Sequence, residues 1–114
     1  MRDIDEYQAF TNTTAVYREP LGAIPERLAY CMFGLSGEVG EIAEKFKKKL
    51  RGGGSLTEFQ GDDDIAKELG DVMYYLVAMA EELGYSGSDI LRLNVEKLQS
   101  RQKRGVIHGE GDNR

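Results

Sequence analysis

Residues 34–46, GLSGEVGEIAEKF, and residues 67–76, KELGDVMYYL, carry the same pattern of acids, aliphatic residues and glycine. In each, an acid is followed by an aliphatic residue, a glycine, a second acid and a second aliphatic residue. On a helix, acids three positions apart lie on neighbouring turns of one face. The pattern predicts two helices, each with an acidic pair at the edge of an apolar arc. These arcs are Leu35, Val39, Ile42 and Phe46 in the first helix, and Ile65, Leu69, Val72 and Leu76 in the second.

Antiparallel packing of these helices through their arcs predicts a cluster of four carboxylates, from Glu38, Glu41, Glu68 and Asp71. Converging carboxylates repel one another unless a cation holds them. Ligation by oxygen alone favours Mg²⁺, Mn²⁺ or Ca²⁺ over zinc or copper. A single Glu-x-x-Glu is more often a solvated helix face, with Glu41 paired to Lys45 one turn later. Two copies in matched register favour a metal site.

Other metal and nucleophile chemistries find little support in the sequence. Ferritin-like di-iron bundles need Glu-x-x-His pairs, and the single histidine is His108, near the C-terminus. The single cysteine, Cys31, cannot form an internal disulfide, which is typical of a reducing cytoplasm. Its place in an apolar helix predicts a buried structural thiol. No arrangement of residues resembles a nucleophile with its base.

Composition indicates one helical domain without a membrane segment. The chain has 114 residues, of which 40% are hydrophobic and 31% charged, and only two are proline. Its apolar stretches are interrupted by Glu or Gly, and MRDIDEYQ lacks the apolar core of a signal peptide. The net charge of −5 argues against binding a nucleic acid polymer. We expect the basic run at 47–51 to be a solvated helix end, where cations suit the helix dipole.

Periodicity and capping residues predict an all-α fold, a bundle of four to five helices with antiparallel core helices. The predicted helices span about 3–16, 25–50, 62–83 and 88–104, the last capped by Ser88 or Asp89, with a break at 20–22. Residues 51–61 are expected to form a flexible connection. The helical domain is assigned to residues 1–104 and a glycine-rich tail to residues 105–114. Glycines at 34, 37 and 40 predict close approach of another helix or a bound group, with a kink as the alternative.

With these acids in place, the chain resembles the MazG-like all-α nucleoside triphosphate pyrophosphohydrolases. Their signature is Glu-Glu-x-x-Glu followed by a spacer and Glu-x-x-Asp. Gly37 stands where the longer signature has its first glutamate, but GLSGEVGEIAE is similar to the small single-domain branch that includes the dCTP pyrophosphatases. A later family segment, Asn-x-x-Lys-apolar-x-x-Arg, matches Asn94, Lys97, Leu98 and Arg101. The resemblance covers roughly residues 28–104.

The resemblance implies Mg²⁺-dependent hydrolysis of a nucleoside triphosphate to the monophosphate and pyrophosphate, with Mn²⁺ as a substitute. Glu38, Glu41, Glu68 and Asp71 would hold the metal, and Glu38 or Glu41 would also serve as the general base. It further implies that Asn94, Lys97 and Arg101 contact the substrate phosphates, since charged side chains one turn apart can clamp phosphate oxygens. It suggests a homodimer or a homotetramer that completes the core, and clearance of non-standard or surplus nucleotides.

Aromatic side chains near the acids are candidates for contact with a nucleotide base. Tyr75, beside the second acidic pair, is a candidate for stacking on a base, as are Tyr7 and Phe10 of the first helix. His108, Glu110 and Asp112 could reach a neighbouring subunit's metal site, but a mobile tail is the preferred reading. Two other functions stay open: a related enzyme acting on phosphoribosyl-ATP, and a metal-stabilised helical module without catalysis that binds nucleotides or a protein partner.

Overall fold

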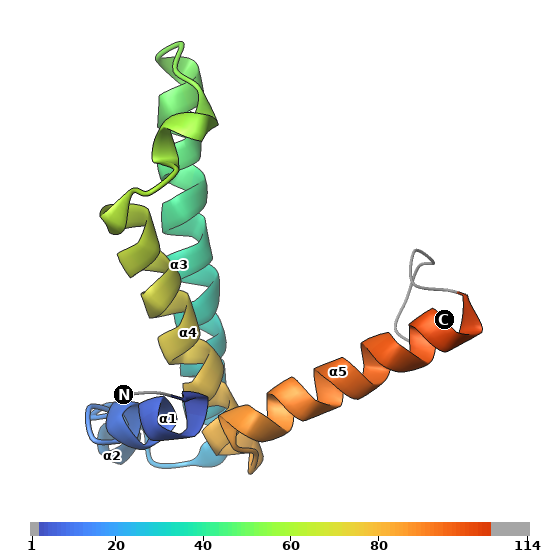
Figure 1. The fold of residues 1–114 in the computed structure, drawn as a ribbon. Helices are drawn as coiled ribbons and strands as arrows, with labels where there is room; N and C mark the ends of the chain where they lie inside the picture. The colour runs from blue at the N-terminus through green and yellow to red at the C-terminus, as the bar shows by residue number, and fades with distance from the viewer. Residues whose placement is uncertain (1–2, 106–114) are drawn as a thin grey trace.

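The computed structural model describes residues 3–105, and in that range the chain is helical throughout apart from its connections (Figure 1). None of these residues forms a strand, so the predicted all-α fold is confirmed. No helix in the described part has both the length and the apolar character needed to cross a membrane. In chain order the elements are α1 (Ile4–Asn12), α2 (Arg18–Leu21), α3 (Ile24–Arg51), the 3₁₀ turn η1 (Leu56–Phe59), α4 (Asp63–Leu83) and α5 (Gly87–Arg104).

The two longest helices, α3 and α4, lie antiparallel and side by side, as the paired acids predicted (Figure 1). Pro25 occupies the first turn of α3, where its missing N–H is not needed. Asp62 caps α4 by accepting hydrogen bonds from the backbone N–H groups of Asp64 and Ile65, at 2.9 and 3.1 Å. Gly84 ends α4 with φ of 85°, a conformation that favours glycine.

The contact between α3 and α4 does not run through the centre of the predicted apolar arcs. Val39 and Leu69 are 51% and 54% exposed, so their predicted burial is wrong. The side chain of Tyr75 instead lies against Gly34, where an added Cβ would come within 2.4 Å of the ring. The helices are therefore rotated so that the Gly34 face of α3 meets α4. The predicted close approach occurs at this glycine and not at positions 37 and 40, where an added Cβ meets no atom within 4 Å.

The N-terminal helix α1 is attached to α4 and α5 by a buried glutamine. Gln8 Nε2 donates to the backbone carbonyls of Val77 and Tyr85, at 3.2 and 3.1 Å, and to Glu81 Oε2 at 3.1 Å. Its Oε1 accepts from the Gly87 N–H at 2.8 Å. A buried amide with all of these bonds made fixes the position of α1, because any shift would leave buried polar groups unpaired.

The helix predicted over residues 3–16 ends early, at Asn12. The hydroxyls of Thr13 and Thr14 donate to the carbonyls of Phe10 and Thr11, at 2.6 and 2.8 Å. Such bonds offer the backbone an alternative to helix continuation. The predicted break at 20–22 is also wrong in part, because Pro20 lies inside the one-turn helix α2 and only Gly22, with φ of 75°, breaks the chain.

A buried ion cluster fixes α2 beside the helical hairpin that α3 and α4 form. Glu82 of α4 has a side chain that is 4% exposed and accepts from Arg18 Nε of α2 at 3.1 Å and from Arg27 Nε of α3 at 2.9 Å. Because three helices share this carboxylate, it holds Tyr17, just before α2, over the face of α3 that carries Tyr30. The ring centroids of these tyrosines are 4.4 Å apart.

The connection at 51–61 is not wholly irregular, contrary to prediction. Ser55 and Glu58 form a capping box that starts η1, with the Ser55 N–H donating to Glu58 Oε2 at 2.7 Å. Phe59 then packs on Phe46 of α3, with ring centroids 5.2 Å apart. The Ser-x-x-Glu spacing in this segment was a readable signal for such a turn.

Within the described range, the last helix, α5, contacts α1 and α4, and beyond its N-terminal end it projects away from α3 and α4 (Figure 1). Ser86, not Ser88 or Asp89, is its N-cap, and Ser86 and Asp89 form a capping box. Ser88 is instead bound by Asp5 of α1, whose carboxylate accepts from both the N–H and the hydroxyl of Ser88. The predicted end at Arg104 is confirmed, with Gly105 at φ of 70°.

We predict that Gln8→Ala lowers the free energy of unfolding by roughly 2–4 kcal/mol, because three backbone groups lose their buried partner. Urea denaturation at neutral pH measures the change. Gln99→Ala, which removes an exposed amide from α5, is the control and should stay within about 0.5 kcal/mol of the wild type. Equal losses in the two variants would contradict the role given to Gln8.

Candidate functional site

Three carboxylates meet between α3 and α4, as the sequence predicted. Glu38 and Glu41 of α3 and Glu68 of α4 each place one oxygen within 4.8 Å of the others. Glu38 Oε2 and Glu68 Oε2 are buried and have no hydrogen-bond partner among the described residues. Buried carboxylate oxygens without partners are costly. A donor set of oxygens in this state fits a hard divalent cation such as Mg²⁺ or Mn²⁺.

A lysine from α3 neutralises part of this charge. Lys45 Nζ lies 3.0 Å from Glu68 Oε1, across the helix pair. The hydrogen bond to Lys45 holds the pKa of Glu68 below its ordinary value and raises the pKa of Lys45. The alternative in which Lys45 pairs with Glu41 on its own helix is therefore not found. The Lys45–Glu68 pair depends on how α3 and α4 are rotated against each other, and helical periodicity does not determine that rotation.

Glu38 lies among other carboxylates and, unlike Glu68, has no lysine beside it within residues 3–105. Its pKa is raised, first by burial and then by the nearby carboxylates of Glu41 and Asp71. No lysine or arginine forms an ion pair with it in the described range. A carboxyl group with a raised pKa binds a proton more readily than the same group does in water.

Asp71 lies beside the three-carboxylate cluster and is not part of it. It lines a cavity together with Glu38, and its charge raises the pKa of Tyr7 after the larger effect of burial. The structure thus brings three of the four predicted metal ligands within 4.8 Å of one another and leaves the fourth next to Glu38.

Tyrosine rings form the wall of the cavity that Glu38 and Asp71 line. The cavity has a volume of about 500 Å³. Tyr30 stands 6.3 Å from Tyr75 between ring centroids, and Tyr74 stands 5.2 Å from Tyr75. Burial raises the pKa of Tyr75 to about 12, so its hydroxyl stays neutral at physiological pH. The remaining lining residues are Thr14, Val16, Tyr17 and Pro20.

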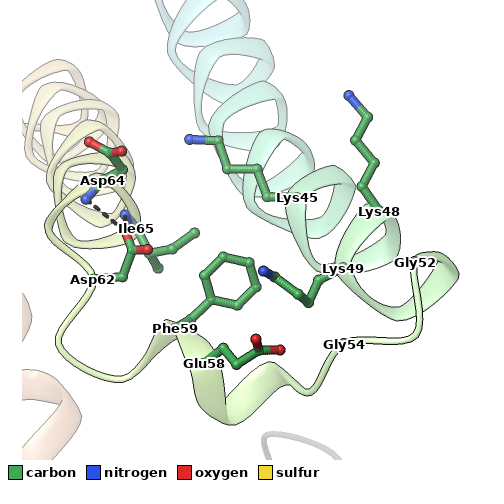
Figure 2. A pocket seen from close by; sticks show the side chains of 10 residues that line it. All are labelled: Lys45, Lys48, Lys49, Gly52, Gly54, Glu58, Phe59, Asp62, Asp64 and Ile65. Carbon is green, nitrogen blue, oxygen red and sulfur yellow. Dashed lines mark hydrogen bonds between the residues drawn. The ribbon is translucent and has the colours of Figure 1, made fainter.

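A second cavity of about 620 Å³ opens near the far end of the hairpin, between α3, η1 and the start of α4 (Figure 2). Lys45, Lys48 and Lys49 of α3 line it, and Phe59 lies opposite them. Lys49 Nζ stands 5.3 Å from the centre of the Phe59 ring. Since Lys45 also bonds Glu68, this cavity adjoins the carboxylates, and the tyrosine cavity adjoins them at Glu38.

The predicted phosphate-binding residues do not lie near the carboxylates of the same chain. Asn94 lines a small, largely apolar cavity between α4 and α5, with Met73 and Leu91. Lys97 and Arg101 lie further along the projecting part of α5 (Figure 1). Arg101 is buried.

The predicted base-contacting residues occupy different surroundings. Tyr75 lines the tyrosine cavity. The hydroxyl of Tyr7 donates to the Gly70 carbonyl at 3.3 Å, which ties α1 to α4 next to Asp71. Phe10 is more than half exposed on α1. His108, Glu110 and Asp112 lie outside the described residues.

Sequence reasoning missed several residues of these cavities. Tyr30 and Lys45 share one face of α3 with Glu38 and Glu41, so helical periodicity alone could have included them. Tyr17 carried no such signal, because it lies outside α3 and α4 and reaches the cavity through the Arg18–Glu82 ion pair. Cys31 is fully buried, as predicted, and its Sγ lies 3.4 Å from the Tyr17 hydroxyl.

The sequence matches the model of one known protein family. Residues 28–106 match the MazG nucleotide pyrophosphohydrolase domain, which is more than half of the chain. The chain belongs to this family. The matched range contains all four predicted metal ligands. It also contains the lysines and the tyrosine of α3 that line the two cavities, and the whole of α5.

A phage protein is similar along almost its whole length. The chain is 44% identical over 113 residues to the Gene 37 protein of Mycobacterium phage L5, covering 97% of this chain and 98% of that protein. No solved structure shows significant similarity to the chain.

We predict that Glu38→Gln raises the melting temperature in EDTA at pH 7. The folded state raises the Glu38 pKa, so this group favours folding only below its ordinary pKa of 4.5 and the benefit is lost as pH rises through the raised value. The difference between variant and wild type should therefore close toward pH 4. Thermal melting followed by circular dichroism measures it.

Glu44→Gln, on an exposed position of the same helix, is the matched control. Added Mg²⁺ should raise the melting temperature of the wild type and of Glu44→Gln more than that of Glu38→Gln. A lower melting temperature for Glu38→Gln in EDTA at pH 7 would contradict this account of the site.

Proposed function

We propose that this MazG-family chain is a Mg²⁺-dependent nucleoside triphosphate pyrophosphohydrolase that converts an NTP or dNTP to the monophosphate and pyrophosphate. The carrying observation is the cluster of Glu38, Glu41 and Glu68, in which two buried oxygens find no hydrogen-bond partner among residues 3–105. Its position between a tyrosine cavity and a lysine cavity supports a substrate with an aromatic end and an anionic end. A role in clearing non-standard or surplus nucleotides is part of this proposal.

Glu38, Glu41 and Glu68 would hold the metal, with Asp71 beside them; Mn²⁺ has the same ligand preference. When bound, Mg²⁺ neutralises phosphate charge and lowers the pKa of a water molecule at the site. Hydrolysis breaks the anhydride bond between the α- and β-phosphates. The attacking water gives a proton to Glu38 or Glu41, its oxygen joins phosphorus, and pyrophosphate leaves.

The tyrosine cavity is the proposed site of the nucleoside. Tyr17, Tyr30 and Tyr75 offer ring faces and edges on which a base can stack. Tyr75 thus keeps its predicted role in base contact. Tyr7 and Phe10 of α1 remain proposed contacts from the neighbouring helix, with the Tyr7 hydroxyl already committed to Gly70.

We further propose that the chain works as a homodimer or a homotetramer. Its radius of gyration is 17.1 Å, against about 13 Å for a compact chain of this length. Met73, Leu91 and Val95 are each about half exposed. A second copy packed on this apolar surface would complete the core and would let α5, with Asn94, Lys97 and Arg101, reach substrate phosphates in a neighbouring site.

Substitution of Leu91 tests the assembly. Leu91→Glu places a charge in the apolar cavity between α4 and α5 and should reduce the mass measured by light scattering to that of the monomer. Gln99→Glu adds the same charge on the same helix and should leave the mass unchanged. A wild-type chain that is monomeric at micromolar concentration would overturn this part of the proposal.

Release of pyrophosphate from a panel of canonical and modified NTPs and dNTPs, with Mg²⁺ or with EDTA, tests the function. We expect turnover of one or a few nucleotides with Mg²⁺ only, and pyrophosphate without orthophosphate. Glu68→Gln should lower kcat about 100-fold or more, as when a group that stabilises developing charge is removed. Glu44→Gln should retain wild-type turnover.

Two other results of the nucleotide panel would favour a different function. Turnover of phosphoribosyl-ATP alone would assign the chain to that related activity. Metal-dependent melting without any turnover would favour a non-catalytic module and would overturn the proposal.

A further inference from the structure

One face of α3 carries acids followed by lysines. At about 100° per residue, Glu38, Glu41, Lys45, Lys48 and Lys49 fall within an arc of about 100°. Lys45 follows Glu41 by four residues, or about 6 Å along the axis. A helix that presents carboxylates and then ammonium groups in one line offers adjacent places for a cation and for an anion.

The lysines of this face border the second cavity, next to the carboxylates (Figure 2). Lys45 joins the two places, because it lines the cavity and its Nζ lies 3.0 Å from Glu68 Oε1. Lys48 lines the same cavity and forms no ion pair with any carboxylate between residues 3 and 105. Lys45 and Lys48 stand on the same helix as Glu38 and Glu41, whereas Lys97 and Arg101 belong to α5, which projects away from that helix (Figure 1).

The cavity also contains acids, but two of them already bind helix N-termini. Glu58 Oε2 accepts from the Ser55 N–H at 2.7 Å. Asp62 Oδ1 accepts from the N–H groups of Asp64 and Ile65. Hydrogen bonds from backbone N–H groups offset part of the charge of such carboxylates. The lysines are the groups on this wall able to bind a further anion.

We propose that Lys45 and Lys48 are phosphate-binding residues, and that the Lys45 ammonium exchanges Glu68 for the terminal phosphates of a nucleotide when a cation occupies the carboxylates. The inference rests on the proposed function. A cation takes over the charge compensation that Lys45 gives Glu68, and the released ammonium stays within reach of the cavity. The ligand is then the β- and γ-phosphates, which leave together as pyrophosphate.

Two opposite effects of one substitution test the exchange, with pyrophosphate as the probe and binding measured by calorimetry. Lys45→Met removes an ammonium that competes for Glu68, so Mg²⁺ alone should bind a few-fold more tightly. In saturating Mg²⁺ the same variant should bind pyrophosphate about 10-fold more weakly, the order expected for one lost charge-assisted hydrogen bond. Lys48→Met should weaken pyrophosphate binding similarly and leave Mg²⁺ affinity unchanged.

Lys47→Met is the matched control, since Lys47 lies about 180° around α3 from Glu38 and pairs with Glu44. It should change neither affinity, and Lys45→Arg should restore pyrophosphate binding. Equal pyrophosphate affinity in wild type, Lys45→Met and Lys48→Met would overturn the inference, as would weaker Mg²⁺ binding in Lys45→Met. Nucleotide turnover by the wild type, measured in parallel, shows whether such a failure also removes the proposed function.

Discussion

Repulsion among three carboxylates, held together by the packing of two long helices, is the constraint on which this site depends. Glu38 and Glu41 share one face of α3, and the packing of α4 against α3 brings Glu68 within 4.8 Å of them. Burial strengthens the repulsion, since it removes the water that would screen it. The structure offsets this cost in part through the Lys45–Glu68 ion pair. Unfavourable interactions of this kind are typical of places where a fold serves function rather than stability.

The two sides of the carboxylate cluster differ in chemistry. The tyrosine cavity and the lysine cavity lie at different positions along α3 and α4, and the carboxylates lie between them. A nucleoside triphosphate has the same order of chemistry, with an aromatic base, an anhydride to be cleaved and terminal phosphates. This polarity follows from one face of α3, which presents Tyr30, then Glu38 and Glu41, then the lysines.

Buried polar contacts fix the positions of α1, α2 and α5 relative to α3 and α4. Gln8 binds α1 to α4 and α5, and Glu82 binds α2 to both long helices. Through Glu82 the chain places Tyr17 over the tyrosine cavity. Among the described residues, the same packing leaves the apolar side chains of Met73 and Leu91 about half exposed. An exposed apolar surface of this kind is typical of association between subunits.

The sequence by itself determined the all-α class, the bounds of α3 and α4 to within a residue or two, and the meeting of Glu38, Glu41 and Glu68. These depend on local signals, namely helical periodicity, the Asp62 cap and glycines at helix ends, which act over a few residues. Tertiary structure decided the rotation of α3 against α4, which exposes Val39 and Leu69. It also decided the Lys45–Glu68 pairing and the place of Tyr17. Periodicity defines which residues share a face but not which part of a broad face meets its neighbour, and that choice is made by contacts such as Tyr75 on Gly34.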